Sequence, residues 1–271
     1  MITGLLPVDG ATIYFEQRGT GPLMLISQSG EGDAQRSVDL VDALEDDFTC
    51  LTYDRRGLSR SPVEDPQVAI ADHAEDARSL LAHLADGPAF MLGCSFGAVI
   101  GLHLAADHPE HIATLIAHEP VAPWLLPPDA AAAHRRELAD LQHLYAADGL
   151  MAALPAIAAS LGIDPAGPTE PDLTPQPMND QRRTNFAHFI TNEFTAIRTD
   201  PGCLSQLDAT TAAIIPAAGV TTPRTAFDYQ AALHLAELLN RPLTTLPAGH
   251  NGNLTHPRAW ANQLRTLLNT R

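Results

Sequence analysis

The most informative absence in this 271-residue chain is lysine, because all sixteen of its basic residues are arginine. Enzymes that form a Schiff base, pyridoxal-phosphate enzymes and P-loop NTPases each require a lysine, so none of these classes can be built from this sequence. The lack of lysine together with abundant alanine is typical of a GC-rich bacterial genome.

Cysteine and long apolar runs are also scarce. Cys50, Cys94 and Cys203 are widely spaced and form no C-x-x-C pair, so neither a disulfide framework nor a zinc site is indicated. We therefore expect no metal and no other cofactor. No stretch reaches eighteen consecutive apolar residues, which excludes a membrane-spanning helix. Residues 1–7 lack the basic and apolar regions of a signal peptide, so a cytoplasmic location is expected.

Positive charge is in short supply as well, with 32 acidic residues against 16 basic ones and a net charge of −16. Such an acidic chain repels phosphate backbones, so we expect no nucleic-acid partner. The remaining composition, 45% hydrophobic and 18% charged, is ordinary for a soluble globular protein. We expect a small hydrophobic molecule as the binding partner, and a homo-oligomer is an alternative to a monomer.

Short apolar runs alternate with segments of helical spacing along most of the chain. Strands are expected at 11–17, 23–26, 48–53, 89–92, 112–117, 212–216 and 243–246. Helices are expected at 38–44, 70–84, 98–106 and 227–239, with a last helix from about Ala259. Apolar runs that alternate with helices predict βαβ units, and hence an α/β fold with a mostly parallel sheet flanked by helices.

The alternation stops between residues 121 and 210. This segment contains helical stretches and no convincing strand, and residues 165–177 are rich in proline, which predicts a loop. The sequence therefore predicts a core of residues 1–120 and 211–271. A helical cap, residues 121–210, is inserted after the strand that ends near Glu119.

The pentapeptide Gly-Cys-Ser-Phe-Gly at 93–97 matches the pattern G-x-S-x-G. It lies between an expected strand and an expected helix, which is the setting of a nucleophile elbow. In that turn Ser95 stands at the N-terminus of the helix, where free N–H groups and the helix dipole favour a developing oxyanion. We predict Ser95 as a nucleophile. An ordinary glycine-rich turn is the alternative.

Four segments of the chain carry a family resemblance: the elbow, Tyr-Asp-Arg-Arg-Gly-Leu-Ser at 53–59, the Gln-Ser-Gly loop at 28–30 and Ala-Gly-His at 248–250. With them the chain resembles the α/β-hydrolase fold family, of the bacterial serine ester-hydrolase type. The resemblance extends over nearly the full chain. It implies that His250, after the last strand, is the catalytic base, and that the N–H groups of Phe96 and Gly30 form the oxyanion hole. Gln28 stands where the family usually has histidine.

The acid of the triad departs from the commonest family pattern. Residues 217–223, after the strand at 212–216, contain no carboxylate. Glu119 ends the strand that follows the elbow helix, and some family members, such as certain haloalkane dehalogenases, place their acid there. We therefore predict Glu119 as the acid and keep Asp228 as the alternative.

A serine nucleophile favours acyl transfer, because the haloalkane dehalogenases and epoxide hydrolases of this family use a carboxylate at that position. The sequence predicts a hydrolase that cleaves a small to medium hydrophobic ester, lactone or thioester through a Ser-His-Glu triad and an acyl-enzyme. We expect substrate-binding residues in the cap, namely Trp124, Tyr145, Phe186 and Phe189. A non-hydrolytic enzyme (a cyclase, dehydratase or C–C bond hydrolase of natural-product metabolism) and a non-catalytic ligand-binding protein are the alternatives.

Overall fold

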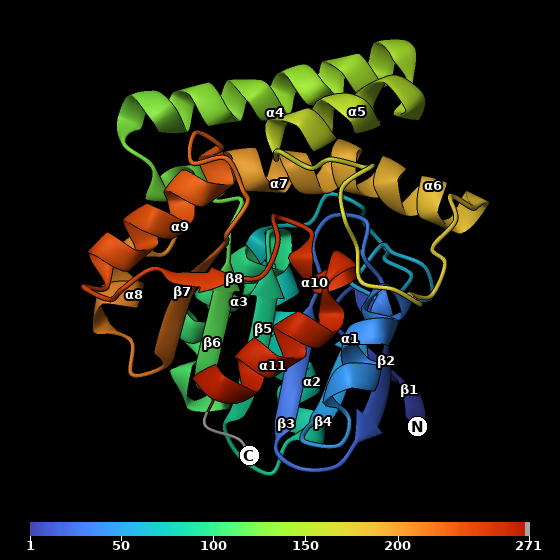
Figure 1. Ribbon diagram of the computed structural model, residues 1–271, viewed down its shortest axis with the longest axis vertical. Helices are drawn as coiled ribbons and strands as arrows, with labels where there is room; N and C mark the ends of the chain where they lie inside the picture. Colours follow the sequence, from blue (N-terminus) through green and yellow to red (C-terminus); the bar gives the residue numbers. More distant parts are fainter. Residues whose placement is uncertain (269–271) are drawn as a thin grey trace.

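The apolar runs form a single eight-stranded sheet, shown by a computed structural model that describes residues 1–268 (Figure 1). The strands are β1 (Ile2–Val8), β2 (Ala11–Gly19), β3 (Leu23–Ser27), β4 (Thr49–Tyr53), β5 (Ala89–Cys94), β6 (Ile112–His118), β7 (Ala213–Gly219) and β8 (Thr244–Leu246). They lie in the order β1-β2-β4-β3-β5-β6-β7-β8. β2 pairs antiparallel with β1 and β4, and all other pairs are parallel. The predicted fold class is confirmed.

Helices cover both faces of this sheet. The core helices are α1 (Val38–Leu44), α2 (Ile70–Leu84), α3 (Phe96–Asp107), α9 (Phe227–Leu238), α10 (Gly252–Thr255) and α11 (Pro257–Leu267), with short 3₁₀ turns η1 (Ala34–Ser37) and η2 (Pro109–His111). Successive side chains of a strand point to opposite faces. In β3, accordingly, Leu25 belongs to the apolar cluster with α2 and α3, whereas Met24 and Ile26 belong to the cluster with α1 and α11. Burial on both faces explains why these strands appear as continuous apolar runs.

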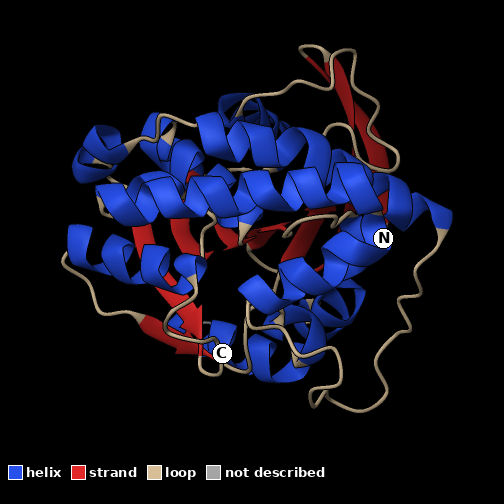
Figure 2. Ribbon diagram, turned by 90° about the horizontal axis from the view of Figure 1, so that it is seen from above, coloured by secondary structure: helices blue, strands red, loops and turns tan. Residues whose placement is uncertain are grey.

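The chain between β6 and β7 is helical. It contains η3 (Pro123–Leu125), α4 (Pro128–Asp148), α5 (Leu150–Ser160), α6 (Asp180–His188), the π-helical turn η4 (Phe189–Glu193), α7 (Phe194–Thr199) and α8 (Leu204–Ala209). α4 to α7 lie across the edge of the sheet where the parallel strands end, and in the view from above helices lie in front of the strands (Figures 1 and 2). The insertion begins directly after β6, as predicted.

The strand β1 is the main element that the sequence did not indicate. It pairs with β2 at the edge of the sheet, and the side chains of Ile2 and Leu5 are mostly exposed. An edge strand in contact with solvent has no continuous apolar run by which it can be recognised. Within residues 1–268, no helix is both long and apolar enough to cross a membrane.

Candidate active site

The turn from β5 to α3 holds Ser95 in a strained backbone conformation. Its φ of 54° and ψ of −110° lie in a region that non-glycine residues rarely adopt. Gly93 and Gly97 permit the turn, because a Cβ on Gly93 would approach the carbonyl oxygen of Gly97 to 2.6 Å, and one on Gly97 would collide with the backbone of Ser27. Phe96 opens the helix, so its N–H has no acceptor within the helix.

His250 and Glu119 meet at the same edge of the sheet. Glu119 follows β6 and His250 follows β8, and His250 Nδ1 lies 2.6 Å from Glu119 Oε2. The other carboxylate oxygen, Oε1, accepts the backbone N–H of Gly219 at 2.8 Å. Glu119 is fully buried and has a positive φ of 44°, so the backbone at this strand end is strained.

The surroundings of this pair set its charges. Burial disfavours an ionised Glu119, but contacts with the rings of His118 and His250 outweigh burial and lower the pKa of Glu119 to about 2. Burial also opposes a protonated His250, yet the hydrogen bond and charge of Glu119 raise the pKa of His250 above its ordinary value. Glu119 is therefore ionised at neutral pH, and it holds the Nδ1 proton of His250.

Asp228, the alternative acid, has a different neighbour. It lies at the start of α9, is buried, and its Oδ1 is 3.4 Å from His134 Nε2 on α4. Burial on its own would lower the pKa of His134, but the adjacent Asp228 and Glu137 raise it to about 9. The structure thus brings Glu119, and not Asp228, into hydrogen-bonding contact with His250.

The loop after β3, residues 28–32, is held by a buried arginine. The guanidinium of Arg55 donates to the carbonyl oxygens of Gln28 at 2.9 Å, Gly32 at 3.4 Å, and Gly30. Arg55 is also bonded through two nitrogens to the carboxylate of Glu193, at 2.9 and 3.2 Å, and both side chains are about 1% exposed. Since Glu193 belongs to η4, one ion pair joins the cap to this loop.

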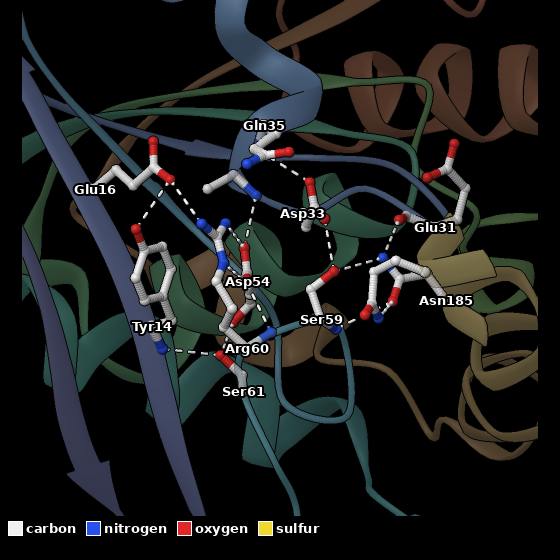
Figure 3. Close-up of polar contacts among 12 residues, drawn as sticks. Tyr14, Glu16, Glu31, Asp33, Gln35, Asp54, Ser59, Arg60, Ser61 and Asn185 are labelled. Carbon is white, nitrogen blue, oxygen red and sulfur yellow. Dashed lines mark hydrogen bonds and ion pairs between the residues drawn. The ribbon is translucent and has the colours of Figure 1, made fainter. Parts of the chain in front are cut away.

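A second set of hydrogen bonds joins α6 to the same loop (Figure 3). Asn185 is fully buried, and its Nδ2 donates to the hydroxyl of Ser59 at 2.9 Å and to the backbone carbonyl of Glu31 at 3.3 Å. The Ser59 hydroxyl in turn donates to Asp33 Oδ2 at 2.6 Å, and the Ser59 N–H donates to Asn185 Oδ1. The cap therefore rests on the loop through buried polar contacts at two points.

Gln28, which stands where the family usually has histidine, is an anchor of this loop. Its Nε2 donates to the hydroxyl of Ser37, and its Oε1 accepts a hydrogen bond from Asn253 Nδ2 at 2.9 Å. Both partners are buried. The substitution thus connects the loop to η1 and α10 and leaves no polar atom of this amide unpaired.

A cavity of about 400 Å³ lies between the core and the cap. Ser95, His250 and Gly30 line it from the core side. Its cap side is mostly apolar and includes Met151, Leu154, Ile157, Leu161, Phe186 and Phe189. A smaller cavity of about 40 Å³ also reaches Ser95, between α4, α7 and α9. Ser95 therefore borders both cavities, and the wall of the smaller one combines apolar side chains with His134, Glu137 and Asp228.

Two of the four cap residues expected in the pocket lie elsewhere. Phe186 and Phe189 line the cavity, whereas Trp124 and Tyr145 do not. Trp124 is buried in the core, where its indole N–H donates to Asp200 Oδ2 at 2.7 Å. Tyr145 packs against the core cluster from α4. Both rings are therefore packed against the hydrophobic core and not against the cavity.

The structure also adds residues that sequence reasoning did not select. Arg36 and Arg182 line the cavity together with Glu31, and Arg55 and Glu193 hold the loop beside it. Arg182 lies 146 residues beyond Arg36, and Glu193 lies 138 residues beyond Arg55. No local sequence motif can indicate a contact between residues so far apart in the chain. Arg55 nevertheless lies within residues 53–59, one of the segments that carry the family resemblance.

Comparisons with known proteins agree with this fold. Residues 22–225 match a family model described as alpha/beta hydrolase fold. The chain is 30% identical over 269 residues to the uncharacterized hydrolase YraK of Bacillus subtilis (strain 168), a match that covers 98% of this chain and 95% of that protein. The crystal structure of a hydrolase from Pseudomonas aeruginosa PA01 has 25% identity and a TM-score of 0.69, with 98% of both chains covered. An esterase from Exiguobacterium antarcticum, at 17% identity and a TM-score of 0.79 over 99% of this chain and 100% of that chain, shares the fold.

Proposed function

Because this chain belongs to the alpha/beta hydrolase fold family, we propose that it is a cofactor-independent serine hydrolase that cleaves a small to medium hydrophobic ester, lactone or thioester. The observation that carries the proposal is the buried contact of 2.6 Å between Glu119 and His250, beside a cavity that both Ser95 and His250 line. The strained elbow at Ser95 supports the same assignment. The family of this chain and its hydrolase relatives support hydrolase activity in general.

The proton inventory of this site fits acyl transfer. Glu119 accepts the Nδ1–H of His250, so the lone pair of the ring remains on Nε2. In the proposed reaction Ser95 Oγ attacks the carbonyl carbon of the substrate while its proton passes to His250 Nε2. His250 then returns that proton to the leaving oxygen or sulfur as its bond to carbon breaks. The products of this half-reaction are an acyl-enzyme on Ser95 and an alcohol or thiol, which in the case of a lactone remains attached to the acyl chain.

Water completes the cycle by the same route. It attacks the acyl carbon and gives its proton to His250, after which the bond to Ser95 Oγ breaks and the serine recovers a proton. The negative oxygen formed in each step needs two donors. The Phe96 N–H, free at the start of α3, is the first of these, and the Gly30 N–H on the loop held by Arg55 is the second.

The cavity supports the substrate class. Its apolar wall of aliphatic and aromatic side chains favours an apolar acyl or ring-bearing group, and about 400 Å³ limits the ligand to small or medium size. Burial of apolar surface contributes about 25 cal/mol per Å² to binding before the costs of association are counted.

A fluorophosphonate probe tests the proposal against its alternatives. We expect it to label wild-type protein at Ser95, identified by peptide mass spectrometry, and to leave Ser95→Ala unlabelled. The same variant should lose about 10⁶-fold in kcat toward short p-nitrophenyl esters with unchanged circular dichroism. Absence of labelling together with retained ligand binding would favour the non-catalytic alternative. Labelling without cleavage of esters, lactones or thioesters would favour the non-hydrolytic enzyme.

A further inference from the structure

One arginine of the cavity wall has no hydrogen-bond partner for its side chain. Arg36 lies in the last turn of η1, and its side chain is 14% exposed and lines the cavity that Ser95 and His250 also line. Of the described residues, Glu31 is the nearest acid, with its Oε1 3.3 Å from Arg36 Nε, and the charge of Asp33 also acts on Arg36. Within the same residues the two terminal nitrogens of this partly buried guanidinium form no hydrogen bond, although an arginine side chain ordinarily engages several acceptors.

Glu31 does not balance the positive charge around it. Its Oε1 is shared between Arg36 and Arg182, and it lies 2.6 Å from Arg182 Nη2. Its Oε2 is buried with no hydrogen-bond partner among the described residues, and its carboxylate points away from Asn185 (Figure 3). Asp33, the next carboxylate along the loop, accepts hydrogen bonds from Ser59 and the Gln35 N–H, and it does not line this cavity.

This part of the cavity wall consequently carries an excess positive charge. Among the described residues, the charged side chains that line this cavity are Glu31, Arg36 and Arg182, so the formal net charge of this cluster is +1. Burial is the main cause that lowers the pKa of Arg36, and the nearby charge of Arg182 acts in the same direction. Both arginines also border an outer groove beneath residues 174–177, so water reaches the charge when the cavity is empty.

We infer that this cluster is a subsite for a carboxylate, so that the preferred substrate is an ester, lactone or thioester bearing a free carboxylate away from its scissile carbonyl. The inference rests on the proposed function and narrows its substrate class. The planar fork of Arg36 matches the two oxygens of a carboxylate. A single negative charge balances the +1 of the cluster, whereas a phosphate dianion would leave a buried excess of negative charge.

The apolar wall and the charged cluster then recognise different parts of one ligand. The aliphatic residues on α5 contact the hydrocarbon portion of the ligand. Arg36 and Arg182 bind its carboxylate beside the loop of residues 28–32. Ser95 and His250 act on the carbonyl between them. A half-ester of an aliphatic dicarboxylic acid has this layout.

Binding to an inactive protein tests the subsite independently of turnover. In the Ser95→Ala background, we expect isothermal titration calorimetry to show that monomethyl adipate binds at least about tenfold more tightly than dimethyl adipate, as one charge-assisted bidentate contact predicts. Adding Arg36→Gln should abolish this difference. Arg183→Gln is the matched control, because Arg183 is exposed on the same helix as Arg182 and does not line the cavity, and it should preserve the difference.

Turnover gives a second, separate readout. The measured quantity is the ratio of kcat/KM for p-nitrophenyl hydrogen adipate to that for p-nitrophenyl methyl adipate, and for 4-acetoxybenzoate to methyl 4-acetoxybenzoate. We expect wild type to favour the carboxylate in one of these pairs, and Arg36→Gln to lower that ratio by about tenfold or more through KM. A purely structural defect would lower both members of a pair equally and leave the ratio unchanged.

The outcomes separate the two proposals. If Ser95 is labelled and neutral esters are cleaved, but neither binding nor turnover prefers the carboxylate, the subsite is overturned and the hydrolase stands. If the carboxylate preference in calorimetry depends on Arg36 while no ester is cleaved, the subsite stands and the proposed reaction fails. Equal affinity for the two adipates in the Ser95→Ala protein contradicts the subsite whatever the reaction is.

Discussion

At the scale of single residues, backbone strain is concentrated around the proposed triad. Ser95, Glu119 and Ala248 are non-glycine residues with positive φ, and they lie at or beside the three proposed catalytic positions. Each such conformation costs of order 1–3 kcal/mol and persists only when the surrounding structure imposes it. Each of the three follows a strand of the sheet, which anchors the strained turn, and β5 and β6 are mostly buried whereas β8 is partly exposed.

Replacing Glu119 by Gln tests the acid. The amide keeps the shape of the side chain but removes the charge that orients and stabilises a protonated His250, so we expect kcat to fall by about 10³- to 10⁴-fold. Steady-state kinetics on a neutral ester gives the measurement. Asp228→Asn is the control and should cost far less, since Asp228 faces His134. A larger loss in Asp228→Asn than in Glu119→Gln would reassign the acid.

The pH dependence follows from the same contact. Catalysis needs neutral His250, so activity is lost as pH falls through the pKa of this residue. Because Glu119 raises that pKa, the acid limb of kcat/KM should lie above the ordinary value of about 6.5. In Glu119→Gln the raising cause is gone while burial remains, and the limb should move to lower pH. If the acid limb of kcat/KM lies at the same pH in Glu119→Gln as in wild type, Glu119 does not raise the pKa of His250.

At the scale of elements, the π-helical turn η4 joins the cap to the core at both of its ends. Phe189 lines the cavity at its start, and Glu193 pairs with Arg55 at its end. A π-turn inserts one residue into a helix and often marks a functional position. Here it lies between α6 and α7, and both ends of the turn contact core residues beside the proposed oxyanion loop.

Glu193→Gln should destabilise the protein strongly. The change leaves the buried guanidinium of Arg55 without its counter-charge, which typically costs about 3–5 kcal/mol. Urea unfolding should show a lower midpoint with an unchanged slope. Glu75→Gln removes a carboxylate from an exposed pair with Arg78 and should change the free energy of unfolding by at most about 0.5 kcal/mol. Equal effects of the two changes would contradict a structural role for the buried pair.

Elements differ in how far the sequence indicates them. Strands buried on both faces, such as β5, appear as apolar runs, and the elbow and the segment ending at His250 are local motifs. Glu119 follows from topology, since parallel strands end at one edge. Trp124 and Phe189 have the same apolar character within the cap, and periodicity alone does not tell which faces the core and which the cavity. Arg36 and Glu193 act through distant partners, so only the folded chain reveals them.

At the scale of the whole molecule, the chain order of the core is interrupted at a single point. The cap enters after β6 and returns at β7, two neighbouring strands of the sheet. Glu119 stands at the start of this insertion, so the proposed acid and the first cap residues share one strand end. This arrangement places α4 to α7 over the edge of the sheet that holds the elbow, without disturbing the pairing of the core strands (Figure 1).

Hydrogen exchange should reveal the Arg55–Glu193 pair as a single cooperative unit. Separating the cap from the loop would expose an unpaired charge in each, so neither segment opens alone at low cost. We expect the amides of residues 28–32 and 189–193 to exchange in wild type with one common opening free energy, measured by mass spectrometry. In Glu193→Gln the two segments should exchange independently. Different opening free energies in wild type would contradict the coupling.

Such coupling makes reactivity conditional on closure. If η4 separates from the core, Arg55 loses the carboxylate that orients it, and the carbonyl groups of Gln28 and Gly30 lose the hydrogen bonds that hold their loop in place. The open form would still display Ser95 to solvent but without an assembled electrostatic environment, so it would discriminate against esters too large for the cap to close over. Size selection would then arise from a conformational gate as well as from the walls of the cavity.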